Sequence, residues 1–126
     1  MFIYFIYVAG GGALGASLRF FVQSISKLYF PNFPVGTLIV NIIGSFLIGL
    51  LANYFNSKEI SELFYKYFII IGLLGSFTTF SAFSIETIEL FKEGRILLSL
   101  IYIFLSFVLT ISAAFLGLSL NKFWFW

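Results

Sequence analysis

Long apolar stretches separated by short charged ones dominate this chain. Residues 2–18, 35–53, 67–85 and 96–121 contain no charged side chain. A helix crosses the hydrocarbon core of a bilayer with about 20 apolar residues, whereas an open sheet would leave its edge backbone groups unpaired there. The pattern therefore predicts an all-α membrane protein, a single domain over residues 1–126. Its four transmembrane helices are expected at roughly 2–26, 35–54, 66–91 and 95–121.

The centre of the third apolar stretch consists of residues that stabilise a helix poorly. These residues are Gly72, Gly75, Ser76, Thr78, Thr79 and Ser81. In hydrocarbon a broken helix persists only where protein or water covers the freed backbone groups. We therefore expect helix 3 to be broken at mid-membrane, and we expect the break to belong to a functional site.

The composition narrows the possible chemistry. Hydrophobic residues make up 61% of the chain and charged residues 10%, and the chain contains no cysteine and no histidine. Disulfides, thiolate chemistry, imidazole metal sites and histidine bases are thereby excluded. The sequence has no plausible nucleophile–base pair, so we expect no enzyme. A net charge of +2 is too small to indicate a nucleic-acid partner.

The positive charges flanking the predicted helices are nearly balanced between the two sides of the membrane. Three lie on each side: Lys58, Lys66 and Lys122 on one, and Lys27, Lys92 and Arg95 on the other. Arg19 makes the balance three against four if it is included. Because an asymmetry in lysine and arginine sets orientation, we expect insertion in both orientations and an antiparallel, dual-topology homodimer. The alternative is that one residue or the N-terminal amine decides a single orientation.

Two of the predicted helices carry polar side chains at every fourth position. They are Thr37, Asn41 and Ser45 in the second helix, and Tyr102, Ser106 and Thr110 in the fourth. Residues at this spacing share one helix face. Interhelical hydrogen bonds would explain a single stripe, but two stripes beside a broken helix favour a polar pathway.

The pathway is expected to favour an anion. Its side chains donate hydrogen bonds, and no carboxylate lies at mid-membrane to attract a cation. Arg19 adds positive charge near the end of helix 1, and Phe80 and Phe83 can present the positive edges of their rings. Glu86 is the deepest of three glutamates at the end of helix 3 and is expected to face an aqueous vestibule.

Small residues recur at the four-residue spacing that allows helices to approach closely. Gly11 and Gly15 form a GxxxG motif, and Ser45 and Gly49 form a second pair of small residues. These motifs predict close helix packing but are only weakly specific for function.

Three segments together resemble the Fluc (CrcB) fluoride channel family. They are GGALGASLRF at 11–20, GTLIVNIIGSFLIG at 36–49 and GLLGSFTTFSAFSIE at 72–86. The third segment is the most specific, and the helix number, helix order and charge balance also match.

The resemblance implies a passive, fluoride-selective channel that exports fluoride through a bacterial inner membrane. It also implies an antiparallel homodimer with two pores and a structural Na⁺ at the dimer centre. Backbone carbonyls of Gly75 and Thr78 would hold the sodium ion, while Arg19 and Glu86 match family positions at the vestibule. The pore-lining residues carried over from the family are Phe80, Phe83, Asn41, Ser81, Thr37, Tyr102, Ser106 and Thr110.

Two other functions fit four apolar helices. A small dual-topology multidrug transporter needs a buried carboxylate in helix 1 for proton exchange, and the only charged residue in helix 1 is Arg19. A non-catalytic membrane assembly subunit would use its small-residue faces for contact and would give no ion flux in liposomes.

Overall fold

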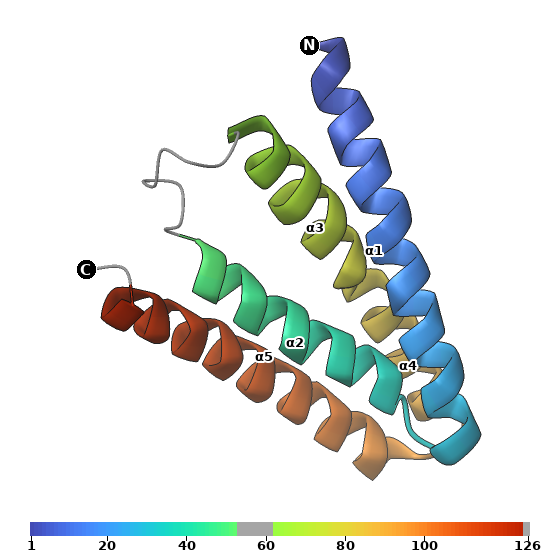
Figure 1. Cartoon of the computed structure of the whole chain (residues 1–126). Helices are drawn as coiled ribbons and strands as arrows, with labels where there is room; N and C mark the ends of the chain where they lie inside the picture. The colour runs from blue at the N-terminus through green and yellow to red at the C-terminus, as the bar shows by residue number, and fades with distance from the viewer. Residues whose placement is uncertain (53–61, 125–126) are drawn as a thin grey trace.

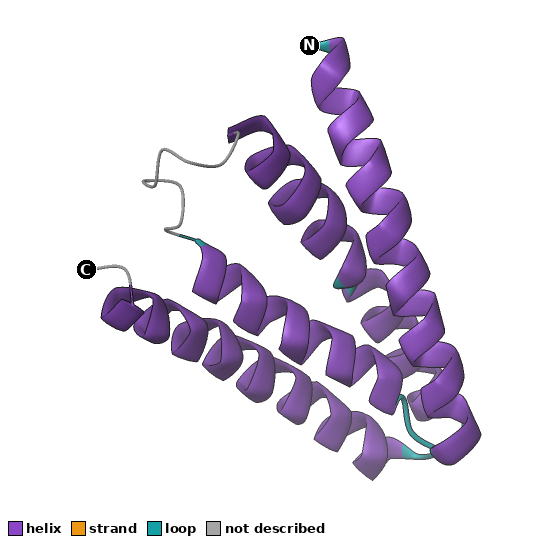
Figure 2. Cartoon of the chain, viewed as in Figure 1, coloured by secondary structure: helices purple, strands orange, loops and turns teal. Residues whose placement is uncertain are grey.

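The computed structural model describes residues 1–52 and 62–124, and in this part every regular element is a helix (Figures 1 and 2). The chain forms α1 (Phe2–Tyr29), α2 (Val35–Leu51) and α5 (Ile96–Trp124). Between α2 and α5, a third rod consists of three successive segments. These segments are η2 (Phe64–Leu74), α3 (Gly75–Phe77) and α4 (Phe80–Lys92).

The four predicted helices are confirmed, although their ends differ from the prediction. The first continues to Tyr29 rather than residue 26, and it ends just before Pro31. A proline disfavours helical geometry at the residue that precedes it, which explains this end better than the charge of Lys27. Lys58 and the expected last turn of the second helix lie outside the described residues.

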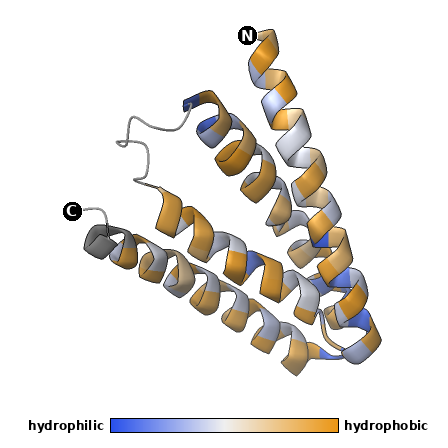
Figure 3. Cartoon of the chain, in the orientation of Figure 1, coloured by the Kyte–Doolittle hydropathy of each residue, from blue (hydrophilic) through white to orange (hydrophobic). Residues whose placement is uncertain are grey.

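Three of the rods are long and apolar enough to cross a membrane. They are Phe2–Tyr29, Phe64–Lys92 and Ile96–Leu120, whereas α2 is equally apolar but has 17 described residues. Apolar residues cover most of each helix, and hydrophilic residues gather where α1 ends and α5 begins (Figure 3). The chain is therefore a multi-pass membrane protein.

The first closely packed helix pair is α1 with η2, whose contact is made by glycine. A Cβ atom added at Gly11 would lie 2.1 Å from the carbonyl oxygen of Phe68, and one added at Gly15 would lie 2.1 Å from that of Leu73. The predicted GxxxG contact is therefore confirmed, and backbone meets backbone along it. The partner segment η2 is π-helical, which the sequence pattern did not indicate.

The second pair is α2 with α5, and glycines meet backbone on both sides. A Cβ atom at Gly49 would lie 2.2 Å from the carbonyl oxygen of Ala114, and one at Gly117 would lie 2.2 Å from that of Phe46. Close packing at Gly49 was predicted, whereas Gly117, which follows Ala113 at the same four-residue spacing, was not singled out.

The two pairs diverge toward the N-terminus of α1 and converge where α1 ends and α5 begins (Figure 1). At the convergent end a buried cluster of Phe83, Leu90 and Tyr102 joins α4 to α5. Phe33 packs its ring edge-on against Tyr102, with centroids 5.5 Å apart, and so ties the α1–α2 connection to this core. The core thereby fixes α4 relative to the other rods.

Candidate functional site

The backbone is extended for two residues between α3 and α4. Thr78 has φ −81° and ψ 154°, and Thr79 has φ −153° and ψ 118°. Helical geometry resumes at Phe80. The polar centre of the third apolar stretch therefore contains a local departure from the helix, at two of the residues singled out from the sequence.

The side chain of Asn41 pairs with both backbone groups of Thr79. Its Nδ2 donates to the Thr79 carbonyl (3.0 Å), and its Oδ1 accepts from the Thr79 amide (2.7 Å). The Thr79 hydroxyl in turn accepts from the Ala82 amide (3.2 Å) and so caps the start of α4. These bonds satisfy backbone groups that a continuous helix would pair internally.

Arg19 satisfies a carbonyl on the other side of the interruption. Its Nε donates to the Ser76 carbonyl oxygen at 3.0 Å. In an unbroken helix that oxygen would accept from the amide of Phe80, which lies beyond the two extended residues. Arg19, expected at a vestibule, is thus placed at the end of α3.

A cavity of about 320 Å³ opens beside the extended residues. Its lining residues come from α2, from the segment between Gly75 and Thr79, and from α4 and α5. The lining residues are Asn41, Ser45, Gly75, Thr78, Thr79, Phe80, Phe83, Ser106, Phe107 and Thr110. We call this space the central cavity.

One buried hydroxyl in the central cavity has no partner. Ser106 is 7% exposed, and its Oγ forms no hydrogen bond. Thr110, one turn further along α5, uses its hydroxyl to donate to the Ser106 backbone carbonyl. Leaving a buried hydroxyl unpaired costs about 1–3 kcal/mol, so Ser106 is poised for a ligand that accepts a hydrogen bond.

Two phenylalanine rings flank the central cavity in different environments. Phe80 is 70% exposed and Phe83 is 7% exposed, with ring centroids 5.4 Å apart. Phe83 also contacts Tyr102 at 5.2 Å and meets Phe107 edge-on at 6.1 Å. The core therefore holds Phe83 in place, whereas Phe80 presents an open face.

A second polar cluster joins α1, α2, α4 and α5 at the convergent end. Gln23 Nε2 donates to Thr37 Oγ1 (2.8 Å), and the Thr37 hydroxyl donates to Glu86 Oε1 (2.7 Å). The Tyr102 hydroxyl donates to Glu86 Oε2 (2.7 Å). Thr37 and Tyr102 are 1% and 0% exposed. We call these residues the Glu86 network.

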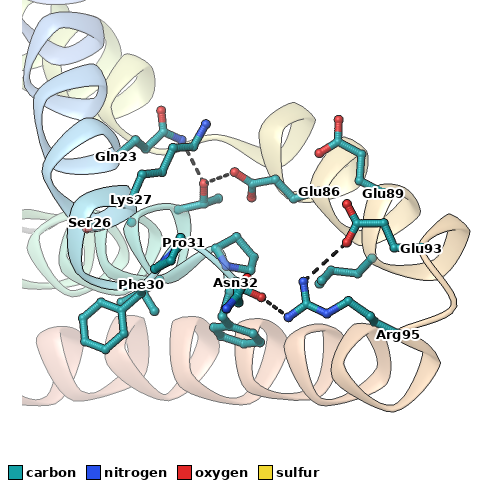
Figure 4. A pocket seen from close by; sticks show the side chains of 16 residues that line it. Gln23, Ser26, Lys27, Phe30, Pro31, Asn32, Glu86, Glu89, Glu93 and Arg95 are labelled. Atoms are coloured by element: carbon teal, nitrogen blue, oxygen red, sulfur yellow. Dashed lines mark hydrogen bonds and ion pairs between the residues drawn. The ribbon is translucent and has the colours of Figure 1, made fainter.

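The Glu86 network borders a second cavity of about 230 Å³ (Figure 4). Gln23 and Lys27 enter its lining from α1, and Glu86 and Glu89 enter it from α4. At its edge Arg95 donates to the Asn32 carbonyl oxygen and forms an ion pair with Glu93 at 3.4 Å. This charged space is called the outer cavity, and Glu86 faces it.

The structure separates the residues carried over as pore lining into two groups. Asn41, Phe80, Phe83, Ser106 and Thr110 line the central cavity together with Gly75 and Thr78. Thr37 and Tyr102 instead bind Glu86. Ser81 is exposed on the first turn of α4, with its Oγ 3.2 Å from the Thr79 Oγ1, and it does not line the central cavity.

Gln23 was not singled out from the sequence, although it completes the Glu86 network. A single glutamine near the end of a predicted helix usually faces the interfacial water. The structure marks Gln23 through its close contact with Gly36, where an added Cβ atom would lie 2.7 Å from the Gln23 Cα.

Comparison with known proteins identifies the family. The model of the CrcB-like family (Camphor Resistance, CrcB) matches residues 6–118. The chain belongs to the CrcB family. A relative from Agrobacterium fabrum, named fluoride-specific ion channel FluC, is 47% identical over 116 residues, which are 91% of this chain and 93% of the relative.

Other relatives of the same name cover the chain as completely. A protein from Rhizobium etli is 44% identical over 93% of this chain and 94% of its own length, and one from Idiomarina loihiensis is 41% identical over 95% and 93%. The CrcB family consists of ion channels rather than enzymes. The family membership of this chain, together with its apolar helices, identifies it as a multi-pass bacterial membrane protein.

Proposed function

We propose that this protein is a passive, fluoride-selective channel that lets toxic fluoride leave the bacterial cytoplasm across the inner membrane. The observation that carries the proposal is the buried, unpartnered Ser106 hydroxyl in the central cavity. A hydroxyl in this state needs a hydrogen-bond acceptor, and fluoride is a small acceptor of high charge density. The name borne by the relatives supports fluoride as that anion.

The central cavity offers an anion several further attractive groups. The α4 helix starts at its wall, and the first amides of a helix lack internal partners and carry partial positive charge. The exposed ring of Phe80 can turn a positive edge toward the cavity. Among the described residues that line it none is a carboxylate, which argues against a cation-exchanging multidrug transporter.

A route can connect the central cavity with the outer cavity. On α2 Thr37 borders the outer cavity and Asn41 the central one, a single turn away. On α4 Glu86 and Phe83 are related in the same way. We therefore propose that the extended residues Thr78 and Thr79 lie at mid-membrane and that the polar stripes mark the anion pathway. Ser81 is proposed to contribute its hydroxyl to this pathway where it faces a partner chain.

The functional unit is proposed to be an antiparallel homodimer with two pores. Phe80 lines the central cavity and is 70% exposed in one chain, and an approaching second chain would cover this open face. Gly75 is also exposed, and a Cβ atom there would meet its nearest atom, the Ile70 carbonyl oxygen, at 3.6 Å. Packing within one chain therefore does not explain this glycine, whereas the approach of a second chain does.

The geometry near Gly75 and Thr78 fits the proposed structural Na⁺. In a continuous helix the Gly75 carbonyl would accept a hydrogen bond from the Thr79 amide, but that amide donates to Asn41 Oδ1 instead. The Thr78 carbonyl would likewise accept a hydrogen bond from the Ala82 amide, but that amide donates to the Thr79 hydroxyl oxygen instead. Both carbonyls are thus released for another partner, and freed carbonyls at helix breaks coordinate cations in transporters. Bound sodium would supply positive charge that holds two chains together.

Fluoride and chloride efflux from proteoliposomes, recorded side by side with ion-selective electrodes, tests the proposal. We expect fluoride efflux well above that of protein-free liposomes, chloride efflux equal to that background, and a marked loss of fluoride efflux in Phe83→Ile. Phe91→Ile, at an exposed position outside the central cavity, is the matched control and should conduct normally. Fluoride efflux at the background level would refute the channel and favour an assembly subunit. Purification in a bulky organic cation instead of sodium should weaken dimer assembly.

A further inference from the structure

The hydrogen bonds of the Glu86 network run in one direction. Gln23 donates to Thr37, Thr37 donates to Glu86, and Tyr102 donates to the other carboxylate oxygen of Glu86. An amide nitrogen can only donate. The single hydroxyl hydrogen of Thr37 is therefore left for Glu86.

We infer that Gln23 is a positioning residue that orients the Thr37 hydroxyl toward Glu86, so that both carboxylate oxygens of Glu86 receive a hydrogen bond at the mouth of the anion pathway. This inference rests on the proposed fluoride channel. A carboxylate with a donor on each oxygen presents less negative potential to a passing anion than one with a free oxygen. Gln23 thus lowers the electrostatic barrier without touching the ion.

The packing of α1 against α2 makes this contact specific. A Cβ atom added at Gly36 would lie 2.7 Å from the Gln23 Cα and 3.1 Å from the Ser26 Cβ. The absence of a side chain at Gly36 therefore lets α1 approach α2 beside Thr37. Because Thr37 is 1% exposed, water does not compete freely for its hydroxyl.

An acceptor at position 23 would reverse the first bond. In Gln23→Glu the new carboxylate attracts the Thr37 hydrogen, so Glu86 loses one of its two donors. The loss of a hydrogen bond to a charged group changes an equilibrium or rate constant by about tenfold or more. We therefore expect the rate of fluoride efflux from proteoliposomes to fall about tenfold. In Gln23→Met the orienting donor is lost but no acceptor competes for the Thr37 hydrogen, so efflux should fall by less than it does in Gln23→Glu.

Asn32→Asp is the matched control, since it also converts an amide into a carboxylate in the lining of the outer cavity. It leaves Thr37 untouched and should reduce efflux less than Gln23→Glu does. An equal loss in Asn32→Asp would show that added negative charge alone explains the effect. An equal loss in Gln23→Met would show that Gln23 acts through packing. Either result overturns the inference.

Introducing Gln23→Glu into a Thr37→Val background separates the two residues. Without a hydroxyl at position 37, the substitution should cost no more than Asn32→Asp costs. A loss as large as in the wild-type background would overturn the inference, because Gln23 would then act without Thr37.

A measurement on the wild-type protein does not depend on how any charged variant folds. In ¹⁵N NMR spectra of the detergent-solubilised protein, one Gln23 side-chain amide proton should exchange slowly and resonate downfield, as assigned by its loss in Gln23→Met. It should shift in Thr37→Val. Free exchange of both Gln23 amide protons would overturn the inference. Wild-type protein that shows this protected proton but conducts no fluoride would refute the proposed channel while leaving the network intact.

Discussion

At the scale of single residues, two buried serines on α5 differ in whether the hydroxyl has a partner and in whether the residue lines the central cavity. Ser106 has none, whereas Ser99, 2% exposed, donates to the Thr87 carbonyl at 3.0 Å. The difference separates a hydroxyl that stabilises the fold from one that is available to a ligand. Stability and conduction should therefore respond in opposite ways to their removal.

Ser106→Ala is expected to leave the thermal unfolding temperature unchanged or slightly raised, because it removes an unpaired buried hydroxyl that costs about 1–3 kcal/mol. The same variant should conduct fluoride more slowly, since a donor is lost from the central cavity. Ser99→Ala should do the reverse, losing about 1 kcal/mol of stability while each folded protein conducts normally. Thermal unfolding and fluoride efflux of both variants measure the contrast, and a strongly destabilised Ser106→Ala would mean that its hydroxyl has a structural partner.

Sequence spacing predicted which polar residues share a helix face, but it did not predict their partners. Thr37 and Asn41 share a helix face, as expected, yet one binds a carboxylate and the other binds the backbone of Thr79. Their partners depend on how far α4 is turned relative to α3, and the two extended residues set that turn. Spacing within α2 contains no information on it.

At the scale of helices, the contact between α1 and η2 distinguishes two adjacent glycines. A Cβ atom at Gly11 would meet a backbone carbonyl oxygen at 2.1 Å, whereas one at Gly10 would meet only the side-chain ring of Phe68, at 3.3 Å. A ring can move by a few tenths of an ångström, but a helix backbone cannot move without separating the pair.

Gly11→Ala is therefore expected to destabilise the protein by about 1–3 kcal/mol or more, the usual cost of overpacking. Gly10→Ala should change stability by less than about 0.5 kcal/mol, as surface substitutions do. Urea or thermal unfolding in detergent, followed by circular dichroism, gives both values. Equal effects of the two substitutions would contradict the backbone contact.

The helices themselves could be predicted because each apolar stretch is long enough to leave no other structure in a bilayer. The π-helical geometry of η2 could not be predicted from the pattern of apolar residues. That geometry places backbone carbonyls of Phe68 and Leu73 against the glycine face of α1, and only the packed pair defines such a contact. Gly117 was missed for the same reason, since its role depends on the opposing backbone of α2.

At the scale of the whole molecule, the balance of positive charge and the open face of the central cavity point to the same assembly. In the proposed dimer a partner would cover the face that exposes Phe80 and Gly75, and a chain with balanced flanking charges could supply that partner in the opposite orientation. The charge balance was visible in the sequence, whereas the exposed face required the fold.

Shifting the charge balance in opposite directions tests whether both orientations are required. Lys27→Gln with Lys92→Gln removes two positive charges from one side of the membrane, and Leu28→Lys with Tyr29→Lys adds two on that side at positions that are 79% and 74% exposed. The positive-inside rule then predicts opposite single orientations for the two double variants. Expressed alone, each should give little fluoride efflux from purified protein, because its chains cannot form an antiparallel pair. Co-expression should restore dimers and efflux. If one double variant alone conducted like the wild type, a single orientation would suffice, and the antiparallel homodimer would have to be abandoned.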